Sequence, residues 1–195
     1  MVIEVVVASS SEAALGEYDI TFVSAGEDYD ANVIARPIVS TYGMVCAAPS
    51  YLQQHGTPTH PQDLQQHQML LRSYAYARGN VLRLRRIDNT LPEEEVHVTP
   101  MLVANHTGTL LRATLDGAGI STQPSDLISR ALCEGKLVQL LPEWTTGVFT
   151  LYATMPSRQF MPARVRALLD FLAENTNRNV SKLLPFGVPP VALKT

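Results

Sequence analysis

Long apolar stretches and clustered positive charges are both scarce in this sequence of 195 residues. No apolar run approaches the roughly 20 residues that a membrane-spanning helix needs, and the first residues lack the pattern of a secretory signal. We therefore expect a cytoplasmic protein without membrane contact. The formal net charge of -3 argues against direct DNA or RNA binding by these residues, since phosphate contacts need clustered Lys and Arg.

Cysteine is scarce as well, and this bears on catalysis. Cys46 and Cys133 are the two cysteines, and each lies in an apolar context without a second ligand at metal-binding spacing. A catalytic thiol needs a lowered pKa and a nearby base. A reversible disulfide between the two requires an exposed thiol. Both cysteines are better explained as core residues of a reduced protein, so we expect no enzyme.

Histidine ligands for a metal are also not indicated. His55, His60 and His67 are spaced five and seven residues apart within a turn-rich segment, which does not place two ligands one helical turn apart. They are better explained as solvated loop histidines. We therefore expect no metal site and no cofactor.

The sequence does contain enough apolar residues for a folded core, with a hydrophobic content of 46% and a charged content of 17%. Its best-defined stretch is 101–144. An apolar strand at 101–103 is followed by a helix over 107–116, which Gly117 and Gly119 end. Residues 121–124 present a hydroxyl cap and a proline at a first helical position, which predicts a second helix closed by Gly135. A strand at 137–141 completes this strand-helix alternation, which is typical of an α/β fold with a parallel sheet.

The remaining elements follow from the same periodicities. The last helix is expected over 162–174, and the extension over 176–195 is sparse in apolar residues, as in a poorly ordered tail or an arm on a neighbour. Short helices are expected at 50–56 and from residue 61 onward. Further strands are expected at 3–8, 19–23, 42–48, 81–87, 96–98 and 149–154.

Polar residues follow several of these strands, where an α/β sheet usually binds ligands. Helix N-termini at this edge carry unpaired N–H groups and partial positive charge, which suit a small anion. Caps alone would explain the same residues, and His106 in particular fits either role. The candidate ligand-binding residues are Ser24, Ala25 and Gly26 after one strand, Asn105, His106 and Thr107 at one helix start, and Thr122 and Gln123 at the next.

Several blocks of this sequence resemble the effector-binding domain of LysR-type transcriptional regulators. The resemblance covers nearly all of residues 3–174, and any one block is weak by itself, whereas six blocks in the family's order are strong. The blocks are Asp19-Ile20-Thr21, the segment 44–52 with its continuations 55–58 and 63–67, the turn Gly117-Ala118-Gly119-Ile120, residues 134–138, residues 141–144, and the closing helix 164–172.

The resemblance implies two Rossmann-like lobes with mixed, mainly parallel sheets, similar to type II periplasmic binding proteins. Lobe one would comprise 1–73 plus 157–175, lobe two 74–156, and 176–195 would extend beyond them. The effector cleft would then lie among the eight candidate residues. The family's winged helix-turn-helix has no counterpart here, nor has its first sensor strand and helix. DNA would thus be contacted only through an absent N-terminal domain, and the chain would form a homodimer or tetramer.

Two functional hypotheses remain open. The first is a ligand-sensing and oligomerising domain of a LysR-type regulator, with a small anionic effector bound between the lobes. The second is a solute-binding protein of transport or a free-standing small-molecule-binding module without DNA binding. A transport protein requires export, which the expected absence of a signal disfavours.

Overall fold

The computed structural model describes residues 6, 18–25, 35–73, 79–155 and 161–181. The strand expected at 3–8 therefore lies outside the described residues except for Val6. The strands are β1 (Thr21–Ala25), β2 (Ala35–Ala47), β3 (Gln68–Arg72), β4 (Val81–Arg86), β5 (Glu94–His97), β6 (Thr99–Ala104), β7 (Ile120–Pro124), β8 (Val138–Leu140), β9 (Trp144–Thr145) and β10 (Val148–Thr154). The helices are α1 (Pro49–His55), the 3-10 helix η1 (Pro61–Gln66), α3 (Thr107–Leu115), α4 (Ser125–Cys133) and α5 (Ala163–Ser181).

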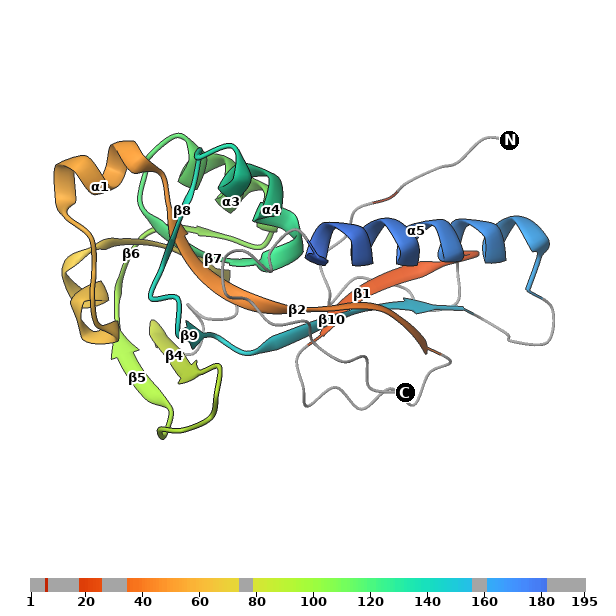
Figure 1. Cartoon of the computed structure of the whole chain (residues 1–195), viewed down its shortest axis with the longest axis horizontal. Coiled ribbons are helices and arrows are strands. Elements are labelled where there is room, and N and C mark those ends of the chain that lie inside the picture. The colour runs from red at the N-terminus through yellow and green to blue at the C-terminus, as the bar shows by residue number, and fades with distance from the viewer. Residues whose placement is uncertain (1–5, 7–17, 26–34, 74–78, 156–160, 182–195) are drawn as a thin grey trace.

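Strand β2 runs through two bodies of the molecule, a smaller one and a larger one. Its first part pairs with β10, and its second part, from Gly43, pairs with β7 and β8. The main sheet has the order β1-β10-β2-β7-β3-β6. Figure 1 shows the resulting shape, in which a smaller body of β1, β10, the start of β2 and α5 adjoins a larger body that holds the other elements.

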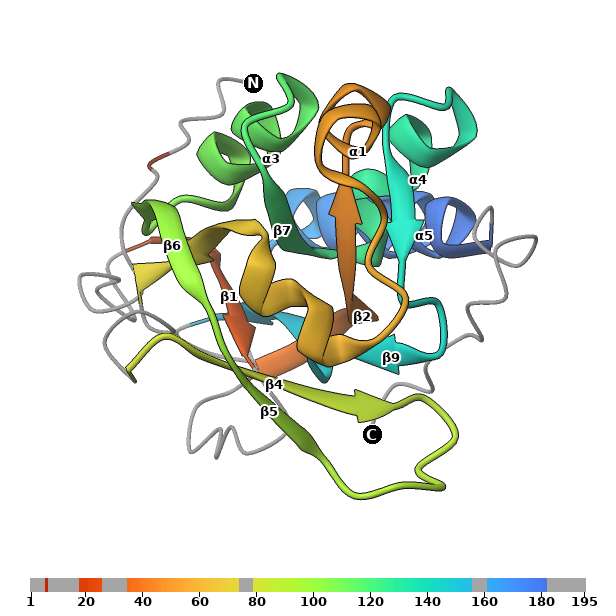
Figure 2. The same ribbon diagram turned by 90° about the vertical axis from the view of Figure 1, so that its left-hand side faces the viewer.

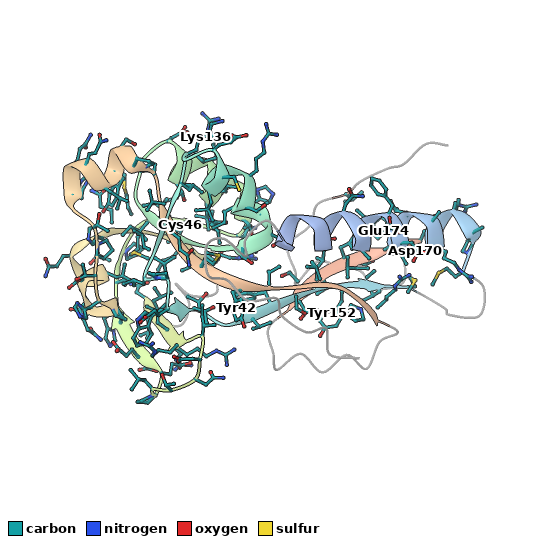
Figure 3. All side chains as sticks on the ribbon, in the orientation of Figure 1. Tyr42, Cys46, Lys136, Tyr152, Asp170 and Glu174 are labelled. Carbon is teal, nitrogen blue, oxygen red and sulfur yellow. The ribbon has the colours of Figure 1, made fainter. Side chains whose placement is uncertain are left out.

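The smaller body has its core between the strands and α5. Ile38 and Ala153 from the sheet pack with Val165 and Leu169 from the helix, and all four are buried. These helix residues lie four apart, as the apolar pattern predicted. Asp170, labelled on α5 in Figure 3, forms an ion pair with Arg36 of β2 at 2.8 Å, which adds a polar contact at the rim.

The larger body has a core on each face of its sheet. On one face Met44 and Cys46 of β2 pack against Ile128 and Leu132 of α4. The opposite face is covered by α1, η1 and the small sheet β5-β4-β9, around the buried side chain of Val45. Figure 2 shows this small sheet and the helices α3 and α4 at opposite sides of the larger body. Alternate residues of β2 thus enter different cores.

Parallel pairing occurs where the sequence indicated strand-helix alternation. β3 lies between β6 and β7 and is parallel to both, so the crossover through α3 passes over it. The prediction of an α/β fold with a mixed sheet is therefore confirmed. Among the described strands, antiparallel pairs are nevertheless more numerous than parallel pairs, because β2 and β10 each pair in antiparallel fashion on both sides.

One local prediction is wrong. Residues 121–124 do not open a helix but form most of β7, and Pro124 precedes the first helical residue, Ser125. The pairing of β7 with both β2 and β3 explains the difference, because backbone hydrogen bonds from two neighbours outweigh a local capping pattern. Thr122 and Gln123 consequently lie near the end of a strand and not at a helix start.

Other element boundaries agree better with the sequence. The helix expected over 107–116 is α3, and the strand expected over 149–154 is β10. α5 begins as expected but continues to Ser181, so the first residues of the expected extension are helical. The rest of that extension lies outside the described residues.

The division into lobes stays a prediction, but the packing favours a different boundary. α1, η1 and β3, which precede residue 74, share one core with β4, β5 and β7, which follow it. The two connections between the bodies instead pass through Gly43 and Gly147, where the Gly43 N–H donates to the Gly147 carbonyl at 2.9 Å. We propose that the lobe boundary lies at these two glycines.

A buried threonine hydroxyl holds this crossing together. The Thr145 Oγ1 lies 3.0 Å from both the Gly43 and the Gly147 carbonyl oxygens and accepts the Gly147 N–H at 3.1 Å. A Cβ at Gly43 would collide with Thr146 Oγ1 and lie 2.7 Å from the Phe149 ring. The crossing therefore requires glycine at residue 43 for close approach.

Candidate functional site

The carboxyl ends of β3, β6 and β7 lie together at one edge of the larger sheet. These three strands are parallel neighbours, and the last residue of β3, Arg72, pairs with the last residue of β6, Ala104. α3 begins shortly after β6 and α4 directly after β7. Because ligands of open α/β sheets bind beyond the carboxyl ends of strands, this edge is the candidate site.

Arg72 places a positive charge at the edge. Its Nη1 donates a hydrogen bond to the Thr107 hydroxyl at 2.7 Å, so a guanidinium sits beside the first residue of α3. The side chain is half-buried. The sequence-based list of site residues did not include Arg72. The sequence feature that could have indicated it is its position directly after the apolar run Met69 to Leu71, because a charge in such a place requires a partner.

Gln123 is the most deeply buried of the predicted site residues, with 1% of its surface exposed. Its Nε2 donates to the Ser121 hydroxyl at 3.0 Å, and Ser121 lies 2.7 Å from the Thr114 hydroxyl of α3. The Gln123 Oε1 is buried and has no hydrogen-bond partner within the described part of the chain. An unsatisfied buried carbonyl oxygen destabilises the fold, so this atom marks a place where a hydrogen-bond donor would bind favourably.

Thr122 and Gln123 do not face the same space. Thr122 pairs with Val45 and Gln123 with Met44, and these two β2 residues belong to cores on opposite faces of the sheet. Only Gln123 is therefore on the α3 side of the sheet with Arg72. The sequence, which placed both residues at a helix start, gave no means of separating them.

His106 is the N-cap of α3. Its Nδ1 accepts the Thr109 N–H at 3.3 Å and lies 3.2 Å from the Thr109 hydroxyl. The capping role is thus observed, while a ligand role for His106 and for the exposed Asn105 stays a prediction. An open hollow of about 540 Å³ adjoins the outer side of this helix and shares only His106 with the predicted site. It is lined by His106, Gly108, Thr109, Arg112, Ala113 and Asp116.

The residues predicted in the smaller body lie at the end of β1. Ser24 and Ala25 pair with Leu151 and Thr150 of β10, and Gly26 lies outside the described residues. Thr150 in turn pairs with Ser40 of β2, and their hydroxyl oxygens are 2.7 Å apart. Across β10, the end of β1 lies level with Ser40 of β2, and the end of β7 pairs with β2 at Gly43, so both ends lie near the same short stretch of β2.

Asp126, in the first turn of α4, adds a titratable group near that stretch. Burial raises the pKa of its carboxyl, while the Thr41 hydroxyl and the backbone N–H groups of Asp126 and Leu127 act to lower it. Thr41 belongs to β2 just before Gly43. The carboxylate thereby connects α4 of the larger body with the strand that both bodies share.

The two cysteines lie in different environments, Cys46 in the core and Cys133 on the surface. Cys46, labelled in the larger body in Figure 3, is fully buried, and burial raises the pKa of its thiol to about 12. Its Sγ lies 3.9 Å from the Ser121 oxygen. Cys133 is exposed at the end of α4. The expectation that Cys133 is a core residue is therefore wrong.

The three loop histidines make local contacts. His67 is nearly buried and its Nδ1 lies 3.2 Å from the Tyr51 hydroxyl, so the expectation that it is solvated is wrong. His55 stacks on the Tyr51 ring with centroids 4.3 Å apart, and His60 caps η1. Across the described ranges, no group of three His, Cys, Asp or Glu side chains is arranged to hold a metal ion.

The fold and this edge define an α/β domain of the type II periplasmic-binding-protein class. The sequence model of the LysR substrate binding domain matches residues 2–177, so the chain belongs to this family of transcription-regulator domains. This confirms the resemblance seen in the sequence. Within the part of the chain that the structure describes, no helix is both long and apolar enough to cross a membrane.

Relatives of known name are transcription regulators. The chain is 35% identical over 142 residues to the probable HTH-type transcriptional regulator LtrA of Klebsiella pneumoniae. The aligned region covers 71% of this chain and 45% of LtrA. It is 32% identical over 152 residues to the HTH-type transcriptional regulator DmlR of Escherichia coli, covering 78% of this chain and 48% of DmlR. The chain thus spans about half the length of these relatives.

Solved structures agree with the family assignment. The regulatory domain of CrgA, a LysR-type transcriptional regulator from Neisseria meningitidis, superimposes with a TM-score of 0.66 at 28% identity, covering 81% of this chain and 75% of that domain. Full-length AphB, the virulence activator of Vibrio cholerae, superimposes with a TM-score of 0.65 at 25% identity, covering 82% of this chain and 52% of AphB.

Proposed function

We propose that this chain is the effector-sensing domain of a LysR-type transcription regulator and that it binds a small anionic molecule at the edge formed by β3, β6 and β7. The observation that carries the proposal is the guanidinium of Arg72, held 2.7 Å from the Thr107 hydroxyl at the start of α3. Family membership supports the sensing role, and the position of this charge supports the class of effector.

The chemistry of the edge suits a carboxylate. A guanidinium donates several hydrogen bonds in one plane and matches the geometry of a carboxylate. The first N–H groups of α3 and the positive end of its dipole add to the attraction. Thr107, which Arg72 already contacts, offers a hydroxyl that can bind the same anion.

The effector would also contact the smaller body. In this proposal Ser24, Ala25 and Gly26 form the facing wall, with Asn105 at the rim. An effector that binds one arrangement of the two bodies more tightly than another shifts the population towards that arrangement. This shift would be the signal that the domain transmits to DNA-binding domains elsewhere in a full-length cytoplasmic regulator.

Self-association belongs to the same proposal, with a homodimer or tetramer as the working unit. β6 ends the main sheet, and its Met101 and Val103 project from one face with 59% and 37% of their surfaces exposed. An apolar face on an edge strand favours association with another chain. The domain would act by binding and not by catalysis, as expected for a relative of transcription regulators.

Arg72 provides the test. Isothermal titration with a panel of small carboxylic acids should reveal at least one ligand, and Arg72→Gln should weaken its binding about tenfold to a hundredfold through loss of charge-assisted hydrogen bonds. Arg83→Gln is the matched control, because Arg83 is exposed on β4 and pairs with Glu95 at 2.9 Å. Circular dichroism verifies that each variant is folded.

Two results would contradict the proposal. One is a panel in which no acid binds the wild-type chain. The other is equal affinity of the wild type and of folded Arg72→Gln for the same acid, which would place the anion elsewhere.

A further inference from the structure

A chain of hydrogen bonds with one possible direction fixes the amide of Gln123. The Thr114 hydroxyl donates its proton to the Leu110 carbonyl at 2.7 Å, so its oxygen can only accept from Ser121, also at 2.7 Å. The Ser121 proton is thereby committed, and its oxygen accepts from the Gln123 Nε2 at 3.0 Å. A reversed amide would set two acceptors against each other.

The Gln123 Oε1 is therefore an acceptor whose orientation is fixed. With Nε2 held by Ser121, the Oε1 of Gln123 is directed away from this chain of bonds and stays unpartnered and buried. The parallel register pairs Leu70 with Ser121. Extended by two residues, this register brings Arg72 of β3 level with Gln123 of β7 on the same face of the sheet. A fixed acceptor and a guanidinium are therefore carried by neighbouring strands at the edge, and neighbouring strands of a sheet lie about 4.8 Å apart.

We propose that the effector is a carboxylic acid that carries a hydroxyl or similar hydrogen-bond donor next to its carboxylate. This inference rests on the proposed function and specifies its ligand. The carboxylate binds Arg72, and the adjacent donor binds the Gln123 Oε1. Acids without that donor leave the oxygen unsatisfied, and sites with a buried polar group discriminate strongly against analogues that cannot pair with it.

Matched acids test the inference on the wild-type chain without any variant. Isothermal titration compares lactate with propionate and 2-hydroxybenzoate with benzoate, so that each pair differs only in the hydroxyl group. We expect the hydroxy acid of at least one pair to bind about tenfold to a hundredfold more tightly than its partner.

Variants then assign the preference to the proposed atoms. Gln123→Met removes the acceptor at similar volume and should abolish the preference while the unsubstituted acid still binds. Gln139→Met, on β8 away from the edge, is the control and should keep the preference. Thr114→Val frees the Ser121 proton and lets the Gln123 amide reverse, so this variant should show a smaller preference. Thr114→Ser keeps the hydroxyl and should retain the preference of the wild type.

The outcomes separate the inference from the proposed function. Equal binding within both pairs overturns the inference and leaves an anion site at Arg72 intact. A preference that persists in folded Gln123→Met overturns the role of Gln123. Failure of every acid to bind the wild type contradicts the proposed function itself and the inference with it.

Discussion

The surroundings of His67 favour its neutral form. Its Nδ1 faces the Tyr51 hydroxyl at 3.2 Å, and that oxygen already accepts the Gln68 N–H at 2.9 Å, which leaves the tyrosine proton for the imidazole. Burial and the nearby His55 lower the pKa of His67, while Asp63 acts in the opposite direction.

Stability should therefore fall in mild acid. The unfolded chain binds a proton at an ordinary histidine pKa of about 6.5, above the folded-state pKa of His67. The free energy of unfolding is then fully retained above that pH and decreases as the pH falls towards the lowered value. Urea unfolding between pH 5 and 7.5 should show this slope, and His67→Gln should flatten it.

The control is His97→Gln, a histidine exposed on β5, which should leave the slope as in the wild type. Asp126 acts with opposite sign, because a carboxyl pKa raised on folding adds stability as the pH falls. Keeping the titration above pH 5 limits that contribution. Equal slopes for the wild type and His67→Gln would show that His67 is not responsible.

At the scale of residues, the sequence predicted positions better than orientations. It placed Thr107 and Gln123 at the candidate edge but grouped Thr122 with them, although Thr122 faces the other core. Arg72 was not predicted because its contact is with Thr107, 35 residues further along the chain. A contact of this range exists only once β3 and β6 have paired.

At the scale of elements, the start of α3 depends on an unusual cap. Histidine is not among the preferred N-cap residues, yet the His106 ring nitrogen accepts the Thr109 N–H. We expect His106→Ala to lower the free energy of unfolding by about 0.5–2 kcal/mol, as typical caps do. His106→Asn, which retains a side-chain acceptor, should lose much less.

Urea unfolding of both variants measures the capping contribution, and acid affinity measures any ligand contribution. Unchanged affinity in His106→Asn would assign His106 to the helix alone. If alanine and asparagine destabilise α3 equally, the ring acceptor contributes nothing and the cap assignment is wrong.

The error at β7 has a clear physical cause. A hydroxyl, a short spacer and a proline at 121–124 form a good local helix start, and the next nine residues are indeed helical. The local pattern was displaced by only a few residues because it carries no information about neighbours. Pairing with Gly43 to Cys46 of β2, some 80 residues earlier in the sequence, decides that this stretch is extended.

At the scale of the whole molecule, the Thr145 hydroxyl ties the two crossings together. Thr145→Val removes the hydrogen bonds to Gly43 and Gly147 and leaves their buried backbone groups less satisfied, so we expect a loss of about 1–3 kcal/mol. The angle between the bodies should also vary more widely, which small-angle X-ray scattering detects.

Thr145→Ser keeps the hydroxyl and should behave like the wild type in both measurements. If the valine variant scatters identically to the wild type and unfolds at the same urea concentration, the hydroxyl does not hold the crossing.

The family resemblance predicted the whole-molecule architecture correctly, whereas the lobe boundary needs the structure. Nothing in the run from Val39 to Ala47 shows that one uninterrupted strand belongs to both bodies. Gly43 is the only local sign, and a single glycine in a strand has several explanations. The partner that gives it meaning, Gly147, is remote in sequence.

The contact between Gly43 and Gly147 also makes the larger body a cassette inserted into the smaller one. The chain enters and leaves it through backbone atoms 2.9 Å apart. A related cassette with its ends equally close can therefore replace it while β1, β10 and α5 keep their places. Recombination at these two glycines would exchange Arg72 and Gln123 as one unit, so this part of the proposed site can be inherited separately from the scaffold that carries it.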